Sequence, residues 1–192
     1  MIHMLRNRRS IAPLAASLAF LTGGCDGLLD ENPAGTVTPV NFYQTPADGL
    51  TALNATYASL RYYGVVSWSY MIENSTAQSV NRRDRTNNIG CWEVFACRPD
   101  NGSSTGAWED LYQTINRANA VIGNVPNIPE MNDGVRARVI AEAKFARALT
   151  YFNLVRLFGG VPLFEVETTR LSDLAKERST ADQIFDFVIA DL

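Results

Sequence analysis

The sequence predicts an all-α protein built from antiparallel helix pairs that are joined by long irregular loops. Apolar residues recur at steps of three and four over long stretches, and capping residues, prolines and glycines mark the ends of those stretches. Two long helical stretches also follow one another and are rich in alanine and aromatic residues, as in helical-repeat arrays. With 192 residues, 46% of them hydrophobic and 19% charged, the chain is long enough for one globular domain or slightly more.

Residues 1–24 have the features of a secretory signal peptide. Three arginines precede an apolar run from Ile11 to Leu21, and small residues follow the run. The run is about ten residues long, whereas a transmembrane helix needs roughly 20. The segment is therefore predicted to direct export rather than to span a membrane.

The end of this leader, Leu21–Cys25, resembles a bacterial lipobox, in which the cysteine thiol receives a lipid. Thr22 stands where the usual leucine would be. We predict lipidation at Cys25, followed by a lipidated tether and lead-in over residues 25–45, which is rich in turn-forming residues. The alternative is cleavage near Ala19 and free secretion.

A first helix is predicted over residues 46–62, at the start of a helical domain that covers 46–192. Thr45 can cap this helix, Pro46 suits its first position, and Asp48 lies three residues after the cap. The face predicted to be apolar consists of Leu50, Leu53, Tyr57 and Leu60.

Residues 63–104 form a long irregular segment with at most a short helix near 67–73. Long loops in compact domains are uncommon and often bind ligands. Aromatic faces can stack on sugar rings and amides can bind their hydroxyls. The candidate ligand-binding residues are Trp68, Tyr70, Asn74 and Trp92. The alternative is that these side chains, together with amides such as Asn101, pack the loop onto the helices.

Cys91 and Cys97 remain as a pair once Cys25 is assigned to the lipid. Outside a reducing cytoplasm such a pair can close a short loop as a disulfide, and the alternative is two unpaired thiols. No metal site is expected, because the only histidine, His3, lies in the leader.

Two further helices are predicted over 105–124 and 132–158. The first has an apolar stripe that includes Trp108, which is expected in the core, and ends before Pro126. The second is apolar on more than one side, so it is expected to be packed by several neighbours, and Gly159 ends it.

Three polar side chains within these helices are expected to have structural roles. Asn116 and Asn119 are disfavoured in a helix and are expected to bond the backbone of neighbouring loops, and Arg147 can meet a buried carboxylate. After an extended connection over 161–178, Ser179 and Asp182 resemble a capping box. The last apolar stripe runs to Leu192 without a polar tail, which predicts a C-terminally truncated fold.

Charge and composition exclude several functions. Cleavage before Cys25 leaves 14 basic and 20 acidic residues, a net charge of −6, and no histidine. This disfavours nucleic acid as a partner and excludes Ser-His-Asp and Cys-His catalysis. No cofactor and no catalytic residue is predicted: Glu109 and Asp110 are adjacent and point in different directions on a helix.

Short blocks along the chain carry a resemblance. They are Leu28–Pro33, Asn41–Tyr43, Ala52–Tyr57, Trp108–Tyr112, Ile115–Asn119, Ala141–Phe152, Leu154–Leu163 and Arg178–Leu192. In this order they resemble the N-terminal region of the RagB/SusD family, and the resemblance covers the whole chain after the leader.

The resemblance implies a tetratricopeptide-like helical superhelix in a nutrient-uptake lipoprotein of the outer membrane of Bacteroidota. Such proteins bind a glycan or other oligomer and deliver it to a TonB-dependent SusC-like transporter, and they are not enzymes. Family members are considerably longer than this chain. Two alternatives from other classes are a surface glycoside hydrolase that uses only carboxylates and a helical-repeat scaffold with protein partners alone.

Overall fold

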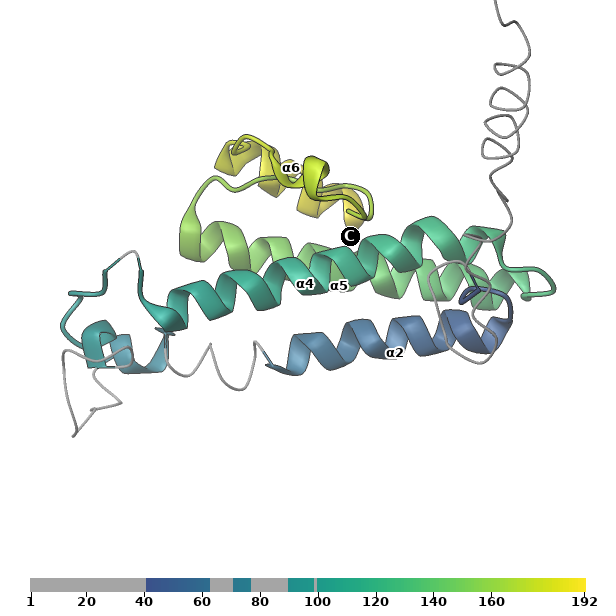
Figure 1. Cartoon of the computed structure of the whole chain (residues 1–192), viewed down its shortest axis with the longest axis horizontal. Coiled ribbons are helices and arrows are strands. Elements are labelled where there is room, and N and C mark those ends of the chain that lie inside the picture. Colours follow the sequence, from purple (N-terminus) through teal and green to yellow (C-terminus); the bar gives the residue numbers. More distant parts are fainter. Residues whose placement is uncertain (1–40, 63–70, 77–89, 99) are drawn as a thin grey trace, which may run out of the picture. The chain divides into compact units, whose positions relative to one another are not determined.

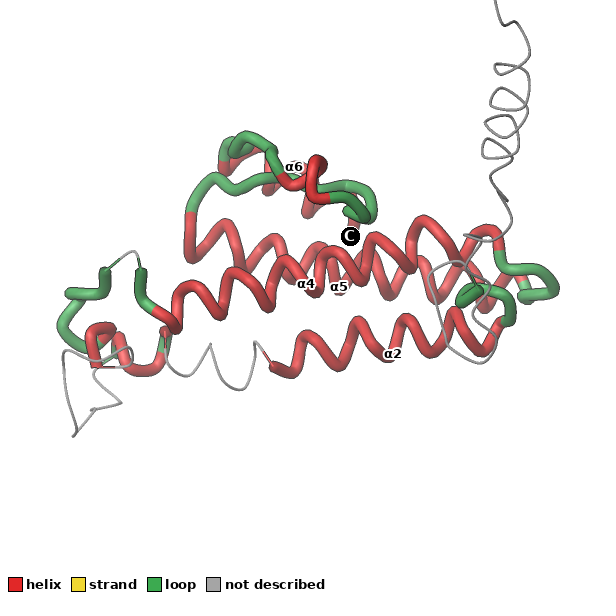
Figure 2. Tube along the Cα trace, in the orientation of Figure 1, coloured by secondary structure: helices red, strands yellow, loops and turns green. Residues whose placement is uncertain are grey.

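The structure, a computed structural model, describes residues 41–62, 71–76, 90–98 and 100–192, which belong to one compact unit. Its helices are α2 (Pro46–Tyr62), α4 (Gly102–Asn124), α5 (Asp133–Phe158) and α6 (Ala181–Asp191). Short 3-10 helices are η3 (Glu73–Ser75), η4 (Gly90–Trp92), η5 (Val125–Asn127) and η6 (Leu171–Leu174). Figure 2 shows helices and loops and no strand in these described ranges, so the predicted all-α class is confirmed.

The long helices α4 and α5 run antiparallel and side by side. Helix α2 packs against both of them, and α6 packs against α5 (Figure 1). The short η5 turn, with Pro126 inside it, reverses the chain between α4 and α5. Because α4 and α5 are antiparallel, the C-terminal half of one meets the N-terminal half of the other, and this divides the buried apolar residues into two clusters.

The first cluster lies where α2, the end of α4 and the start of α5 meet, and its buried residues are Ala52, Leu53, Val121, Val125, Ile128, Met131, Val139 and Ala143. The second lies where the start of α4, the end of α5 and α6 meet. Its buried residues are Met71, Ala107, Leu111, Ile115, Ala148, Tyr151, Leu154, Val155, Val161, Ile184 and Val188. The expectation that the 132–158 helix is packed on several sides is thus confirmed for α5.

Helix α2 has the predicted bounds, and its first turn is capped as expected. The Asp48 carboxylate accepts from the Thr45 backbone N–H at 2.7 Å and from the Thr45 hydroxyl at 2.8 Å. These hydrogen bonds hold the pKa of Asp48 below its usual value, because they favour the ionised carboxylate.

The buried face of α2 differs from the predicted apolar stripe. Leu53 is buried, but Tyr57 is 39% exposed and donates its hydroxyl to Glu142 at 2.9 Å. The other buried positions carry small side chains, namely Gly49, Ala52, Thr56 and Ser59. Small residues let α2 approach the helix pair closely, and a Cβ at Gly49 would lie 3.0 Å from the Ile128 side chain. Buried hydroxyls stay hydrogen-bonded, as from Thr114 to Ser59 at 2.9 Å.

Helix α4 begins three residues before the predicted start, because Asn101 caps it. The Asn101 side-chain oxygen accepts from the backbone N–H groups of Ser103 at 2.9 Å and Ser104 at 3.2 Å. The Asn101 amide is therefore part of the helix cap rather than a free ligand-binding group.

Helix α5 ends at the two glycines, as predicted. Gly159 has φ +70°, where a side chain is strained, and a Cβ on Gly160 would collide with the Ser179 carbonyl oxygen. The close approach of Ser179 to the end of α5 also corrects the predicted start of the last helix. The Ser179 N–H donates to the Val161 carbonyl at 3.0 Å, so the capping box falls one residue later, on Thr180 and Gln183.

Residues 161–178, which we call the strap, cross from the end of α5 to α6 and are held by side chains of α4 and α5. Asn119 donates to the carbonyls of Phe164 and Val166 at 3.0 Å each. Asn116 exchanges hydrogen bonds with the Thr168 backbone, the shorter at 2.7 Å. The structural roles expected for both asparagines are confirmed.

Arg147 connects α5, the strap and α6. Its guanidinium makes a bidentate ion pair with Asp191, at 2.7 and 2.8 Å, and the two side chains are only 6% and 5% exposed. It also donates to Asn119 at 2.6 Å and to the Glu165 carbonyl at 2.9 Å. The buried carboxylate expected for Arg147 is Asp191. A buried charge is tolerated when it is paired and hydrogen-bonded, and this ion pair with its additional hydrogen bonds meets that condition.

Candidate functional site

Two cavities flank Trp108, which is half-buried on α4. One, of about 710 Å³, opens toward the loop before α4, and the other, of about 510 Å³, lies between α4 and the strap. Both volumes fall in the range of about 300–1,000 Å³ that is usual for ligand pockets. Trp108 packs on the second apolar cluster and lines both cavities, so its expected core role is only part of what it does.

We call the larger cavity the aromatic groove. Its apolar lining consists of Met71, Trp92, Phe95, Trp108, Leu157 and Phe158. Its polar lining consists of Cys97, Arg98, Ser104, Thr105 and Arg178. Aromatic faces beside polar groups are the combination that stacks on sugar rings and bonds their substituents.

The exposed aromatic of the groove, Phe95, is presented by residues 91–97, which we call the Cys loop. A disulfide joins Cys91 and Cys97, whose Cα atoms are 4.8 Å apart. Phe95 has φ 54° and is 80% exposed. A left-handed backbone is uncommon for a bulky residue and is found mostly in turns or where the surroundings impose it. Here the disulfide closes the loop around Phe95 and restricts its backbone.

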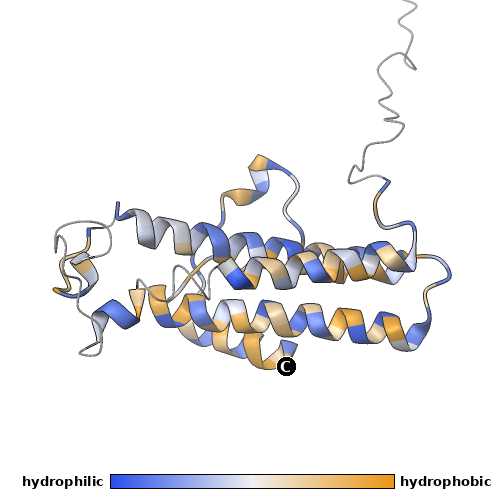
Figure 3. Ribbon diagram, turned by 90° about the horizontal axis from the view of Figure 1, so that it is seen from below, coloured by the Kyte–Doolittle hydropathy of each residue, from blue (hydrophilic) through white to orange (hydrophobic). Residues whose placement is uncertain are grey.

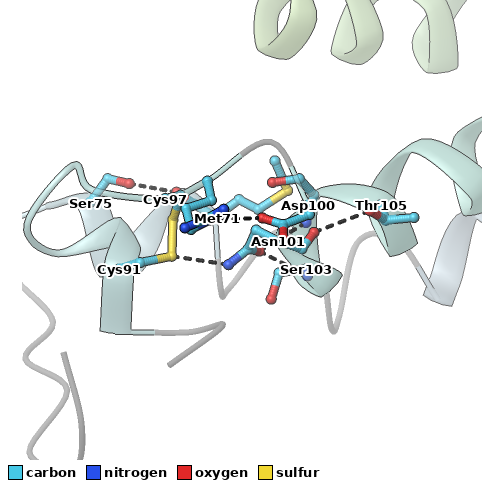
Figure 4. Close-up of a disulfide and its surroundings, with 10 residues drawn as sticks. Met71, Ser75, Cys91, Cys97, Asp100, Asn101, Ser103 and Thr105 are labelled. Atoms are coloured by element: carbon cyan, nitrogen blue, oxygen red, sulfur yellow. Dashed lines mark hydrogen bonds and ion pairs between the residues drawn. A yellow bond between two sulfur atoms is a disulfide. The ribbon is translucent and has the colours of Figure 1, made fainter. Parts of the chain in front are cut away.

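The Cys loop is tied to the start of α4 (Figure 4). The Asn101 side-chain N–H donates to the Cys91 sulfur at 3.0 Å while its oxygen caps the helix. A second bond, from the Ala96 N–H to the Cys91 carbonyl at 3.0 Å, closes the turn inside the loop. One buried side chain therefore fixes both the helix end and the aromatic loop beside it.

The inner wall of the groove is built from packed rings. Trp108 and Phe158 meet nearly edge to face, with ring centroids 5.2 Å apart, and Trp108 and Tyr112 lie 4.8 Å apart. Trp92 is half-buried against the second cluster, and its indole N–H has no acceptor among the described residues. The packed wall holds the ring faces in place before any ligand binds.

The smaller cavity is lined by Trp108, Tyr112, Asn116 and strap residues including Phe164 and Arg170. The Tyr112 hydroxyl donates to the Pro162 carbonyl at 2.7 Å. Burial raises the pKa of Tyr112 and of Tyr151 above the ordinary value of 10.0, so both hydroxyls stay protonated donors even in alkaline solution. Polar side chains of the smaller cavity, such as Tyr112 and Asn116, are thus already hydrogen-bonded to the strap. They are therefore less available to a ligand than the polar groups of the aromatic groove.

The candidate residues from the sequence are only partly brought together here. Trp92 lines the aromatic groove, whereas Asn74 lies in η3 and lines neither cavity. Trp68 and Tyr70 lie outside the described residues. Sequence reasoning missed Phe95, Arg98 and Arg178; the signal for Phe95 was an aromatic residue between two close cysteines.

Within the described residues no cluster of three or more His, Cys, Asp or Glu side chains could hold a metal ion. In that same part of the chain no helix has the length and apolar character to cross a bilayer.

The fold defines an all-helical protein of the tetratricopeptide-like class. A family model described as "Starch-binding associating with outer membrane" matches residues 29–192. The chain therefore belongs to the SusD-like family, and the RagB/SusD resemblance is confirmed.

Curated relatives include SusD-like protein P2 of Formosa agariphila, which is 32% identical over 88% of this chain and 34% of its own length. A SusD-like protein of Bacteroides ovatus is 26% identical over 92% of this chain and 32% of its own length. The chain thus spans about a third of the length of the curated relatives that it matches.

Solved structures support the same fold. A SusD superfamily protein from Bacteroides thetaiotaomicron matches with a TM-score of 0.68 at 23% identity, over 77% of this chain and 36% of that one. A laminarin-binding SusD-like protein matches with a TM-score of 0.64 at 27% identity, over 78% of this chain and 33% of that one.

Proposed function

We propose that this protein is a non-catalytic, lipid-anchored component of the bacterial outer membrane that binds an oligosaccharide. It delivers the oligosaccharide to a TonB-dependent SusC-like transporter. Residues 1–24 act as the signal peptide, Cys25 carries the lipid, and the tether leads to the helical domain that begins near residue 46. The family description supports this proposal, because it names starch binding and the outer membrane.

The single observation that carries the binding proposal is the exposed Phe95 ring at the aromatic groove. One exposed aromatic residue needs no partner by itself, but Phe95 is 80% exposed at a cavity that other aromatic residues also line, and an apolar cavity of this kind is the usual setting of a binding site. The Phe95 ring stands beside the preformed wall of Trp92 and Trp108 and shares the groove with hydroxyl and guanidinium donors. This arrangement suits sugar rings better than a flat apolar partner, because the polar groups would be left unpaired against the latter.

Affinity electrophoresis and titration calorimetry against laminarin and a panel of neutral and acidic polysaccharides test this binding. The Phe95→Ala variant is expected to weaken binding about threefold to tenfold, since a stacked aromatic contact contributes roughly 0.5–1.5 kcal/mol beyond its area. Phe145→Ala is the matched control, because Phe145 is also exposed but lies on α5, outside the groove. If both variants lose the same affinity, the polysaccharide does not bind specifically at Phe95 and the aromatic groove is not its site.

Delivery to a transporter has a separate test. The protein purified from detergent-solubilised outer membranes is expected to bring a TonB-dependent β-barrel with it, and mass spectrometry is expected to find acyl chains on Cys25. Turnover of a polysaccharide that depends on one carboxylate would favour a hydrolase. Protein partners without any sugar binding would favour a scaffold.

A further inference from the structure

The charges that line the aromatic groove are both positive. They belong to Arg98, next to the Cys loop, and Arg178, at the end of the strap, and no Asp or Glu lines the groove among the described residues. The smaller cavity differs, because Glu109 and Arg170 both line it. The chain as a whole is acidic, with 20 Asp and Glu against 17 Lys and Arg. Within the described part of the chain, the charged lining of the groove is therefore positive although the chain as a whole carries a negative net charge.

Arg178 is held at the groove by the backbone. Residue 178 forms an isolated antiparallel bridge with Pro162, and the next N–H, of Ser179, donates to Val161. These bonds lie at the end of α5, whose last residue, Phe158, also lines the groove. The backbone of Arg178 is therefore held beside the aromatic wall, while its side chain remains exposed to solvent.

Arg98 stands on the side of the groove formed by the Cys loop, one residue after Cys97. Its guanidinium pairs with Asp100, at 3.3 Å, and the two side chains are 83% and 76% exposed. An exposed pair of this kind contributes little to stability, so the guanidinium can exchange Asp100 for a ligand anion at small cost. Asp100 itself is not part of the groove lining.

We propose that the oligosaccharide bound by this groove is anionic and carries carboxylate or sulfate groups. This inference rests on the proposed function and names the chemical class of the ligand. Sugar rings stack on Phe95 and Trp108, while the planar forks of Arg98 and Arg178 take the acidic substituents through charge-assisted hydrogen bonds. A neutral glycan would offer no charge-assisted hydrogen bond to either guanidinium, so neither would gain from it what an acidic substituent supplies.

Matched pairs of ligands test the proposal by titration calorimetry on the purified protein. In one arm oligogalacturonate is compared with its methyl ester, which removes the carboxylate charge and keeps the sugar chain. In the other arm a sulfated galactan oligosaccharide is compared with its desulfated form. In at least one arm the anionic member is expected to bind about tenfold or more tightly, and its affinity is expected to fall as salt rises.

Variants locate the effect. Arg178→Gln and Arg98→Gln are each expected to weaken the anionic ligand about tenfold and to leave its neutral counterpart within about twofold. Arg138→Gln is the control, because Arg138 is exposed and pairs with Glu142 on α5, away from the groove. Circular dichroism and a urea unfolding curve check that each variant keeps its fold.

The outcomes separate this inference from the proposed function. Equal or tighter binding of the neutral members, or an unchanged affinity in both arginine variants, overturns the anionic ligand class and leaves sugar binding intact. Failure of every polysaccharide to bind, neutral or acidic, overturns both.

Discussion

The strap and the Cys loop are two irregular segments beside Trp108 that are held in opposite ways. The strap, 161–178, is anchored by side chains that lie far away in sequence, such as Asn119 and Arg147. The Cys loop, 91–97, is closed by a bond between residues six positions apart. The strap depends on the packing of three helices, whereas the Cys loop carries its own closure.

This difference decides what the position of each segment depends on. Backbone carbonyls of the strap accept hydrogen bonds from buried side chains on α4 and α5, and one of these side chains, Arg147, is paired with α6. The position of the strap therefore depends on all three helices. The Cys loop needs only Asn101 from the helical framework, and it leaves Phe95 free at the surface. A ligand-binding aromatic is better placed on a loop that is stabilised locally, because its exposure then does not weaken the core.

The largest effect is expected from Arg147→Met. The variant leaves Asp191 as a buried charge without its partner, which costs about 3–5 kcal/mol of unfolding free energy. Urea unfolding followed by circular dichroism measures it. Arg138→Met, at an exposed pair, is expected to change the unfolding free energy by less than about 0.5 kcal/mol. Equal losses in the two variants would contradict the central role of Arg147.

A smaller effect is expected from Asn119→Ala. It removes the side-chain donor of the Val166 carbonyl and the acceptor of one Arg147 N–H, while the Phe164 carbonyl keeps the Tyr151 hydroxyl, and the loss should be about 1–3 kcal/mol. Amide hydrogen exchange should rise along the strap and not in the Cys loop. Asn127→Ala is the matched exposed control, expected within about 0.5 kcal/mol. Exchange that rises equally in both segments would show that they are not held independently.

Replacing both cysteines, Cys91→Ser with Cys97→Ser, tests the other side of the comparison. Because the closed loop is short, the loss should be about 2 kcal/mol in the chain-entropy account. Exchange in the strap should stay unchanged, and polysaccharide binding through Phe95 should weaken. A loss as large as that of Arg147→Met, or retained full affinity, would speak against a locally closed binding loop.

The smallest effect concerns Tyr43, which precedes α2. Burial, and then the negative charge of the strap residue Glu167, raise the pKa of Tyr43 to about 12 from 10.0. The folded state favours the protonated phenol, so its contribution to stability is full below about pH 10 and is lost as pH rises to about 12. In a tyrosinate titration Glu167→Gln should lower this pKa slightly, and Tyr43→Phe should remove the transition. An unchanged pKa in Glu167→Gln would mean that burial alone is responsible.

The exposed apolar face of α5 and α6 is a third region that the sequence describes poorly. Phe145, Leu149 and Phe152 on α5, and Ile189 and Leu192 at the end of the chain, are all between 38% and 75% exposed. Figure 3 shows hydrophobic residues around the C-terminal end of the chain. Periodicity marks such residues as apolar but does not say which of two apolar faces is covered.

Helix ends were predictable because their causes are local. Pro46 begins α2 and Gly159 ends α5, and in each case the deciding atoms lie within a few residues. The last cap was misplaced by one residue because Val161, eighteen positions away, takes the Ser179 N–H. The predicted α2 face was only partly right: Leu53 is buried and Leu50 packs on the first cluster, but Tyr57 is exposed. Small residues occupy the other buried positions, because they allow a close approach of the helices that a hydrophobic pattern does not reveal.

The amino-acid sequence alone determined the helical class, the ends of α2 and α5, the family resemblance and the roles of Asn116 and Asn119, because periodicity, capping and intrinsic propensity act over a few residues. Tertiary structure alone decided which carboxylate meets Arg147, which cations face the aromatic groove and how Phe95 reaches its edge. Those pairings join residues 44 to 80 positions apart, from Arg147 with Asp191 to Arg98 with Arg178. Nothing in a local pattern specifies which distant side chain arrives, since only the packing of the helices brings the partners within reach.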